Sequence, residues 1–211
     1  MTSEWLRLAP DGRLRCWWCG DDPDYVAYHD NEWGRPVTDD RRLFEKICLE
    51  GFQAGLSWLT ILRKRENFRR AFADFEPHVV ANFGDDDVAR LLADAGIVRH
   101  RGKIEATINN ARRLVELHDT GSTLREVVWG HVSPRPQGRD GNSAHPSGLA
   151  TTSPSAIALS KDLKRRGWRF VGPTTVYSFM QSMGIINDHL DGCCVAASCD
   201  EERSRVLRTA D

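Results

Sequence analysis

KRRGWRFVGPTT, residues Lys164–Thr175, lies between two segments whose apolar residues recur with helical spacing. The segment before it predicts a helix over 155–166, and the segment after it predicts a helix over 174–183. We therefore interpret the quoted stretch as a short turn between two helices. Gly172 in this turn permits a close approach to the backbone.

The start of the second helix, at Pro173 or Thr174, is a candidate anion site. Free N–H groups and the positive end of the helix dipole face outward there. The nearby Arg165 and Arg169 add positive charge. A duplex backbone can be gripped in this way without any reading of base sequence. An ordinary helical hairpin has the same pattern, and pattern alone favours that simpler interpretation.

Helical periodicity continues outward from this hairpin and predicts an all-α class. The further helices expected are residues 39–51, 57–72 and 103–117, and a helix that opens at Asp85 or Asp86 and ends at Gly96. Residues 16–38 are aromatic-rich and irregular, and no β-α-β pattern or repeat stands out. The expected organisation is a polar N-terminal extension over 1–15, one domain over 16–199, and a charged, frayed tail over 200–211. Within the domain, residues 133–154 are rich in Pro, Gly, Ser, Thr and Asn and predict a mobile loop.

Composition excludes several classes of protein. The chain has 211 residues, of which 40% are apolar and 28% charged, which is neither a disordered nor a membrane composition. No apolar run approaches the roughly 20 residues that a membrane-spanning helix needs, and no secretory signal precedes the domain, so we expect a cytoplasmic protein. The net charge of −1 argues against coating nucleic acid by bulk charge. A local basic patch is still compatible with it, and 24 of the 29 basic residues are arginine.

Aromatic residues are concentrated in the first third of the chain. Four of the seven tryptophans, with Tyr25 and Tyr28 among them, fall between residues 17 and 58. A large aromatic core would explain them, since that is the usual fate of tryptophan. A stacking pocket for a flat ligand is the functional alternative.

Cysteine and histidine residues near both chain ends predict a metal site. Cys16, Cys19 and His29 lie near the N-terminus, and His189 and Cys193 are four residues apart near the C-terminus. Two Cys and two His suit tetrahedral zinc and leave no open position, so such a site would be structural. Spacing alone does not decide which N-terminal thiol binds, and buried thiols beside ordinary histidines remain the alternative.

Glu50 is a carboxylate on an apolar helical stripe, seven residues after Leu43 and three after Ile47. A carboxylate at such a position is either paired or functional, because unpaired burial is expensive. A bond to Lys46, four residues earlier, or an escape to solvent is the simpler explanation, and the pattern slightly favours it. If Glu50 is buried, its pKa should rise unless a cation lies nearby.

These residues together resemble the 3-methyladenine DNA glycosylase I family of base-excision enzymes. The resemblance is carried by Cys16 and Trp18 and by the segments Asp22–Gly34, Leu49–Trp58, Arg99–Ile104, Phe170–Gln181 and Asn187–His189. It covers about residues 16–194, nearly the whole domain. The N-terminal extension, Cys19, the long 133–154 loop and the tail depart from the family pattern without touching the pocket residues.

The resemblance implies a helix-hairpin-helix glycosylase fold in which a structural zinc ion joins the N- and C-terminal segments. The zinc ligands it implies are Cys16, His29, His189 and Cys193. The base pocket it implies is formed by Glu50, as the catalytic residue, with Trp18, Tyr25, Tyr28, Trp33 and Trp58. The segment from Gln53 through Gly55 to Leu56 would wedge into the gap left by a flipped base. The hairpin residues Arg165, Arg169, Gly172 and Thr174 would contact DNA.

The activity implied is hydrolytic release of 3-methyladenine from alkylated double-stranded DNA, by a monofunctional enzyme that leaves an abasic site. Methylation at N3 makes the base cationic, so aromatic faces and an ionised Glu50 would select it over neutral adenine. We expect a monomer whose partners are alkylated duplex and the free base. A zinc-stabilised module that binds nucleic acid without catalysis is one alternative. A zinc hydrolase is another, although four protein ligands leave no position for a metal-bound water.

Overall fold

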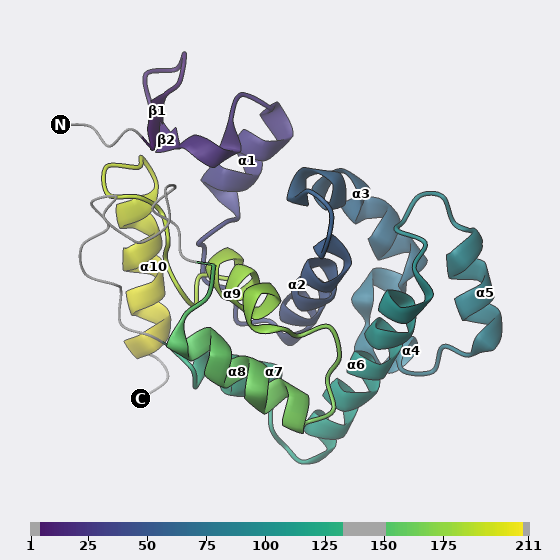
Figure 1. The fold of residues 1–211 in the computed structure, drawn as a ribbon. Coiled ribbons are helices and arrows are strands. Elements are labelled where there is room, and N and C mark those ends of the chain that lie inside the picture. The colour runs from purple at the N-terminus through teal and green to yellow at the C-terminus, as the bar shows by residue number, and fades with distance from the viewer. Residues whose placement is uncertain (1–4, 133–150, 209–211) are drawn as a thin grey trace.

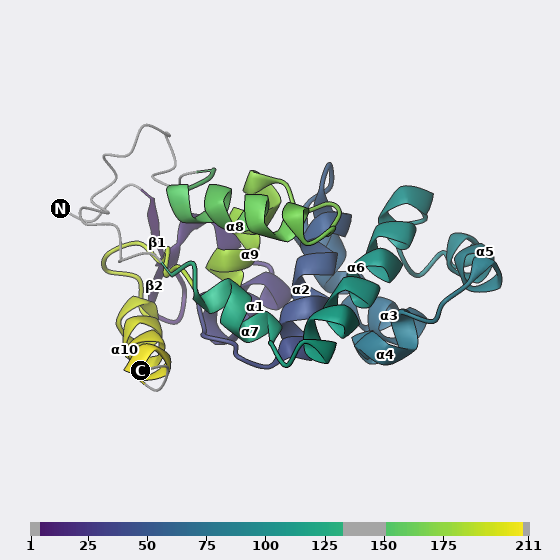
Figure 2. The same cartoon turned by 90° about the horizontal axis from the view of Figure 1, so that it is seen from below.

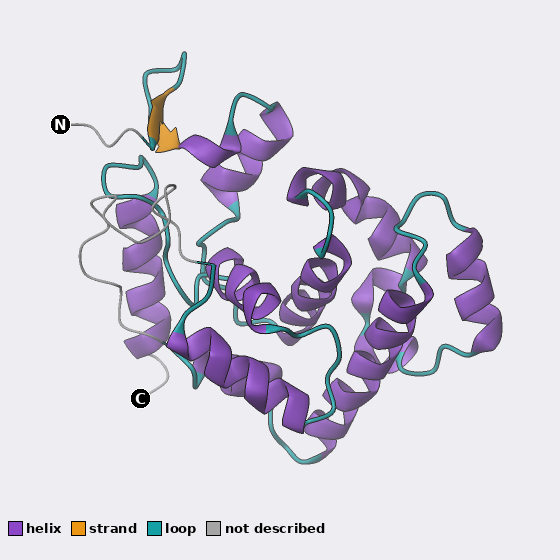
Figure 3. Cartoon of the chain, viewed as in Figure 1, coloured by secondary structure: helices purple, strands orange, loops and turns teal. Residues whose placement is uncertain are grey.

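The computed structural model describes residues 5–132 and 151–208 and is mostly helical (Figures 1 and 3). A single two-stranded antiparallel sheet pairs Leu6 with Cys16 in this part of the chain. The elements are β1 (Leu6–Leu8), β2 (Leu14–Cys16), η1 (Trp17–Cys19), α1 (Pro23–Asn31), α2 (Asp40–Gln53), α3 (Trp58–Ala71), η2 (Ala73–Phe75), α4 (Pro77–Val80), α5 (Asp85–Ala93), α6 (Arg101–Asp119), α7 (Leu124–Trp129), α8 (Pro154–Arg165), α9 (Pro173–Ser182) and α10 (Ala196–Arg208).

Local capping residues explain where the predicted helices begin. Asp39 accepts a hydrogen bond from the Arg42 N–H at the start of α2, and Ser57 accepts one from the Thr60 N–H at the start of α3. Ser153 caps α8 in the same way, with Pro154 at its first position. The predicted mobile loop at 133–154 lies outside the described residues as far as residue 150.

Helix α2 forms the centre of the molecule. It contacts α3, α6, α7 and α9, while α8 packs along α9 (Figure 2). The apolar stripe of α2, including Leu43, Phe44 and Ile47, is fully or almost fully buried in the main core. A side chain on this stripe, such as Glu50, is therefore held by a rigid helix.

The predicted hairpin joins α8 to α9 and is fixed by side chains from neighbouring helices. The amide nitrogen of Asn110 on α6 donates to the Arg169 carbonyl (3.0 Å), and its amide oxygen accepts from the Arg169 N–H (2.8 Å). The Ser160 hydroxyl on α8 donates to the Val171 carbonyl at 2.6 Å. Phe170 adopts a φ of 55°, which is rare for a non-glycine residue.

The structure adds to or corrects the sequence-based description in three places. The segment 16–38, expected to be irregular, contains α1, which begins with Asp22 as cap and Pro23 at its first position. Within the expected N-terminal extension, for which no element was predicted, residues from Leu6 onward form the β1–β2 hairpin, which ends at Cys16. The tail after Cys199 is not frayed but forms most of α10, where buried Arg203 donates to the Ile185 carbonyl at 3.0 Å. The domain boundaries themselves stay predictions.

No described helix is both long enough and apolar enough to cross a membrane.

Candidate functional site

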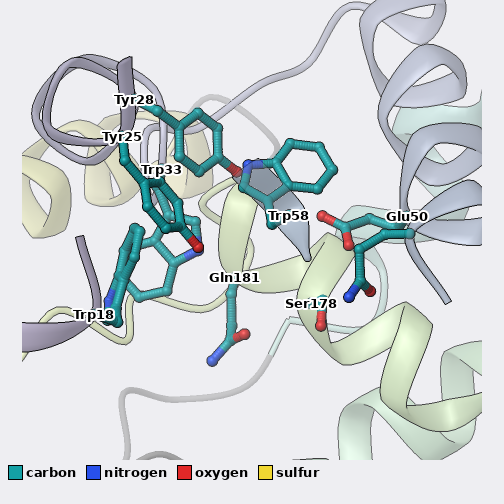
Figure 4. Close-up of a pocket in the computed structure, with 9 residues that line it drawn as sticks. Trp18, Tyr25, Tyr28, Trp33, Glu50, Trp58, Ser178 and Gln181 are labelled. Atoms are coloured by element: carbon teal, nitrogen blue, oxygen red, sulfur yellow. The ribbon is translucent and has the colours of Figure 1, made fainter. Parts of the chain in front are cut away.

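An aromatic pocket with a volume of about 190 Å³ opens between α1, α2, α3 and α9 (Figure 4). The structure brings together in it Glu50 and all five aromatic residues that the sequence analysis assigned to a base pocket. Its lining residues are Trp18, Tyr25, Tyr28, Trp33, Glu50, Gln53, Trp58, Ser178 and Gln181.

The aromatic side of the pocket comes from η1 and α1. Tyr25 and Tyr28 are three residues apart on α1, so their rings lie on one face of this helix, with centroids 6.4 Å apart. Trp18 packs edge-on against Tyr25 at 5.1 Å and against Trp33 at 4.9 Å. These contacts order the rings before any ligand arrives.

The opposite side of the pocket carries Glu50, which α2 presents toward the aromatic residues (Figure 4). Its side chain is 6% exposed, and one carboxylate oxygen lies 3.0 Å from Lys46 Nζ. Burial raises the pKa of Glu50 above its ordinary value, although the ammonium of Lys46 acts in the opposite direction. Glu50 therefore pairs with Lys46 and also lines the pocket, so the two interpretations that the sequence left open do not exclude each other.

Lys46 belongs to the site, although the sequence suggested it only as a bonding partner of Glu50. Its Nζ donates to the Tyr28 hydroxyl at 2.8 Å and lies 3.2 Å from the centroid of the Trp58 ring. Burial lowers the pKa of Lys46 to about 8, although Glu50 opposes this shift. A polar residue at i−4 from Glu50 was visible in the sequence, but its burial was not.

Two polar residues of α9, Ser178 and Gln181, also line the pocket and were missed. They are three residues apart and so share a helix face, which was a usable signal. Gln181 Nε2 donates to the Asp188 carboxylate at 2.7 Å, which fixes its orientation.

The residues predicted to wedge into DNA form the turn between α2 and α3. Gln53 lines the pocket and donates to the Leu56 carbonyl at 2.6 Å, while Gly55 takes a φ of 85° that favours glycine. Leu56 is 40% exposed. The turn is anchored from α6, because Lys103 Nζ donates to the carbonyls of Phe52 and Ala54.

The remaining predicted DNA contacts lie on the α8–α9 hairpin rather than in the pocket. Arg165, Arg169 and Thr174 are exposed, and Gly172 caps α9. Phe170 of the hairpin packs close to Gly51, where an added Cβ would lie 3.3 Å from the Phe170 Cβ. The hairpin and the pocket are thus connected through α2.

A buried Cys/His cluster lies beside the pocket and joins the two ends of the domain. The ligand atoms of Cys16, His29, His189 and Cys193 all lie within 4.8 Å of one another. Cys193 Sγ is 3.5 Å from a nitrogen of each histidine, and Cys16 Sγ is 3.8 Å from His189 Nδ1. Adjacent ligands of a tetrahedral zinc ion are about 3.6 Å apart, so this set fits a metal ion.

The other nitrogen of each imidazole is also bonded. His29 Nδ1 lies 2.8 Å from the Asp30 carboxylate, and His189 Nε2 lies 2.9 Å from the Trp33 carbonyl. Such bonds fix ring orientation in metal sites. Cys19 is outside the cluster: its thiol faces the Cys16 carbonyl at 3.2 Å, and burial raises its pKa to about 11.

Fold and site together define a mostly helical protein with an aromatic pocket for a flat ligand, a buried carboxylate, and a potential metal cluster that joins the chain ends. The chain belongs to the methyladenine glycosylase family, whose model matches residues 18–196. It is 52% identical over 180 residues to DNA-3-methyladenine glycosylase 1 of Escherichia coli (strain K12), covering 85% of this chain and 95% of that protein. It is 44% identical over 179 residues to DNA-3-methyladenine glycosylase of Haemophilus influenzae, covering 85% and 96%.

Solved structures give the same result. A crystal structure of 3-methyladenine DNA glycosylase I matches with a TM-score of 0.80 and 50% identity, covering 85% of this chain and 98% of that one. A variant of 3-methyladenine DNA glycosylase I in complex with 3-methyladenine matches with a TM-score of 0.78 and 38% identity, covering 85% and 96%.

Proposed function

We propose that this protein flips alkylated bases out of double-stranded DNA and hydrolyses the N-glycosidic bond of 3-methyladenine, releasing the free base and leaving an abasic site. The observation that carries the proposal is the buried Glu50 carboxylate facing an ordered aromatic wall in a pocket about 190 Å³ in volume. Membership of the methyladenine glycosylase family and the bound 3-methyladenine of a similar solved structure support it.

Recognition depends on charge and shape. N3-methylation gives adenine a positive charge, which aromatic faces attract by about 0.5–2 kcal/mol each, depending on desolvation. Glu50 accepts a hydrogen bond from the exocyclic amino group and offsets the charge of the base. Neutral adenine lacks this charge, so the pocket discriminates by differential binding after the base has left the stack.

Alkylation also supplies much of the chemical activation, because a cationic base is already a good leaving group. As the bond breaks, positive charge moves from the base to the sugar. A carboxylate that held the cationic substrate more tightly than the transition state would slow this step. We therefore assign Glu50 chiefly to recognition.

We propose that the Cys16, His29, His189 and Cys193 cluster holds a structural zinc ion. Two thiols and two imidazoles whose ligand atoms all lie within 4.8 Å of one another, three of the separations being 3.5–3.8 Å, support tetrahedral coordination with every position taken by protein. The ion would position α1, which carries Tyr25 and Tyr28, and would take no part in hydrolysis.

We also propose a helix-hairpin-helix mode of DNA binding. The start of α9 at Gly172 and Thr174 would bind backbone phosphate, with Arg165 and Arg169 adding charge. Gln53, Gly55 and Leu56 would fill the gap left by the flipped base. Exposure of Leu56 and of both arginines supports this arrangement. A monomeric state stays a prediction.

Incubation with methylated duplex DNA tests the proposal directly. We expect chromatography to detect free 3-methyladenine, with abasic sites in equal amount and no strand cleavage by the protein itself. Unmodified duplex is the matched control and should release no base. A protein that binds methylated duplex but releases nothing would be a non-catalytic binding module.

A further inference from the structure

Lys46 brings a positive charge to the pocket that the proposed recognition of a cation does not use. Its side chain is almost fully buried on α2. The ammonium lies 3.0 Å from Glu50, 2.8 Å from the Tyr28 hydroxyl and 3.2 Å from the centroid of the Trp58 ring. All three partners line the pocket, whereas Lys46 does not.

Lys46 therefore lies one layer behind the pocket wall. Tyr28 and Trp58 line both the pocket and a smaller cavity of about 30 Å³ that Lys46 borders, so they separate the two spaces. A cationic base in the pocket would interact with the Glu50 carboxylate and the Trp58 indole, which are also the partners of the Lys46 ammonium.

Four other charged groups around Lys46 are paired with one another. Glu32, at the end of α1, is paired with Arg65 of α3 at 2.5 and 3.0 Å. Glu45 of α2 is paired with Arg69 of α3 at 2.8 Å. Arg42 of α2 also borders the smaller cavity. The residue that borders it from the end of α9, Met183, is uncharged. The charge of Glu50 is thus balanced chiefly by Lys46.

We propose that Lys46 is a positioning residue that serves as the exchangeable counter-cation of Glu50. It keeps the carboxylate ionised in the empty pocket, gives up a proton to solvent when the cationic base enters, and regains a proton once the base is neutral. This inference rests on the proposed function, because it requires a cationic ligand in the pocket.

The bonding partners of Lys46 suit both protonation states. The Tyr28 hydroxyl can accept a hydrogen bond from an ammonium or donate one to an amine, and Glu50 can accept from either form. Burial already lowers the pKa of Lys46 to about 8, close to neutral pH. A second positive charge across the same two rings would lower this pKa further.

The proton balance is simple. When the base binds, the Lys46 ammonium becomes an amine and one proton goes to solvent. Hydrolysis then converts water and the cationic nucleotide into the neutral base, a sugar hydroxyl and one proton. Reprotonation of the amine restores the enzyme, so each base released yields one proton overall.

The test is an NMR titration of the lysine Cε resonances between about pH 6 and pH 11. The chain has five lysines, and loss of one resonance in Lys46→Met assigns Lys46. Lys46→Arg provides the assignment if the methionine variant does not fold. The titration is repeated with 3,9-dimethyladeninium, whose N9 methyl group fixes the positive charge, and with neutral 3-methyladenine. Tryptophan fluorescence reports binding of each compound.

We expect a midpoint near 8 in the free protein, and a decrease of at least ~1 pH unit with the cation but not with the neutral base. A free-protein midpoint near the ordinary lysine value of about 10 would overturn the inference. So would binding of the cation without any change in the midpoint, and the proposed function would survive that result. If neither compound bound, the proposed function would fail and this inference with it.

Discussion

The Cys/His cluster and the aromatic pocket adjoin each other, yet the polar groups of the two regions are bonded in different ways. Neighbouring residues of α1 contribute to each, with Tyr28 in the pocket and His29 in the cluster. Every cluster side chain is buried and both nitrogens of each imidazole have a contact. In the pocket, the buried charge of Glu50 is balanced by a lysine that can lose its proton. Protein ligands at every position of a metal ion would stabilise structure, whereas the charge exchange proposed for Lys46 would suit a ligand that binds and leaves.

The sharpest way to separate the two regions is to remove a cluster ligand. Cys193→Ser should abolish stoichiometric zinc and cost about 3–5 kcal/mol of stability, because structural metal binding contributes to folding free energy. Metal analysis and thermal unfolding measure both effects. Cys19→Ser is the matched control, since Cys19 is equally buried but outside the cluster. Full zinc content in Cys193→Ser would refute the assignment.

Removal of the Glu50 charge from the pocket should lower activity and leave zinc content and stability unchanged. Glu50→Gln should lower the rate of 3-methyladenine release by about 100-fold while zinc content and the unfolding temperature stay near wild type. Single-turnover base release and thermal unfolding report the two properties. Glu45→Gln removes another buried carboxylate of the same helix, one that pairs with Arg69, and should retain the rate. Equal rates for Glu50→Gln and wild type would remove Glu50 from the mechanism.

Charge on the hairpin should affect DNA binding without altering either region. Arg169→Glu should weaken duplex binding roughly tenfold at low salt and reduce the salt slope by about one, whatever the base sequence. Arg205→Glu, at an exposed position of α10, is the control. Binding isotherms at several salt concentrations provide the measurement, and identical slopes for Arg169→Glu and wild type would exclude the hairpin as a phosphate contact.

The smallest expected effect is on the acid side of the pH–rate profile. Burial raises the pKa of Glu50 above its ordinary 4.5, and the ionised form is needed. The rate should therefore fall as pH drops through a midpoint above 4.5. Lys46→Met should move this midpoint higher, because the cation that lowers the pKa of Glu50 is gone. A midpoint at or below 4.5 in wild type would contradict this role for Glu50.

Periodicity predicted the helices that build the core, because their apolar stripes pack on one another. The predicted segment 39–51 corresponds to α2 and 57–72 to α3, with ends displaced by one or two residues. Helix α1 was not predicted because its aromatic face lines a pocket and its other buried residues, His29 and Asp30, are polar, so no apolar stripe marks it. The pair Asp22-Pro23, a cap followed by proline, was the signal that could have found it.

The composition of the pocket was predicted from a resemblance and not from periodicity. Pattern alone could not decide whether Glu50 bonds Lys46 or has a functional position, because the same carboxylate pairs with Lys46 and lines the pocket. The approach of Lys46 to Tyr28 and Trp58 joins three helices, and no local spacing encodes such a contact. The likeness to the family likewise gave no indication that the chain after Cys199 forms α10.

The cluster also constrains the order in which the chain can assemble. A ribosome makes Cys16 and His29 well before His189 and Cys193, which meet them in the folded protein. Helix α1 packs on α3 and η1 (Figure 1). Until His189 and Cys193 have emerged, the cluster that joins α1 to the later segment cannot form in a growing chain.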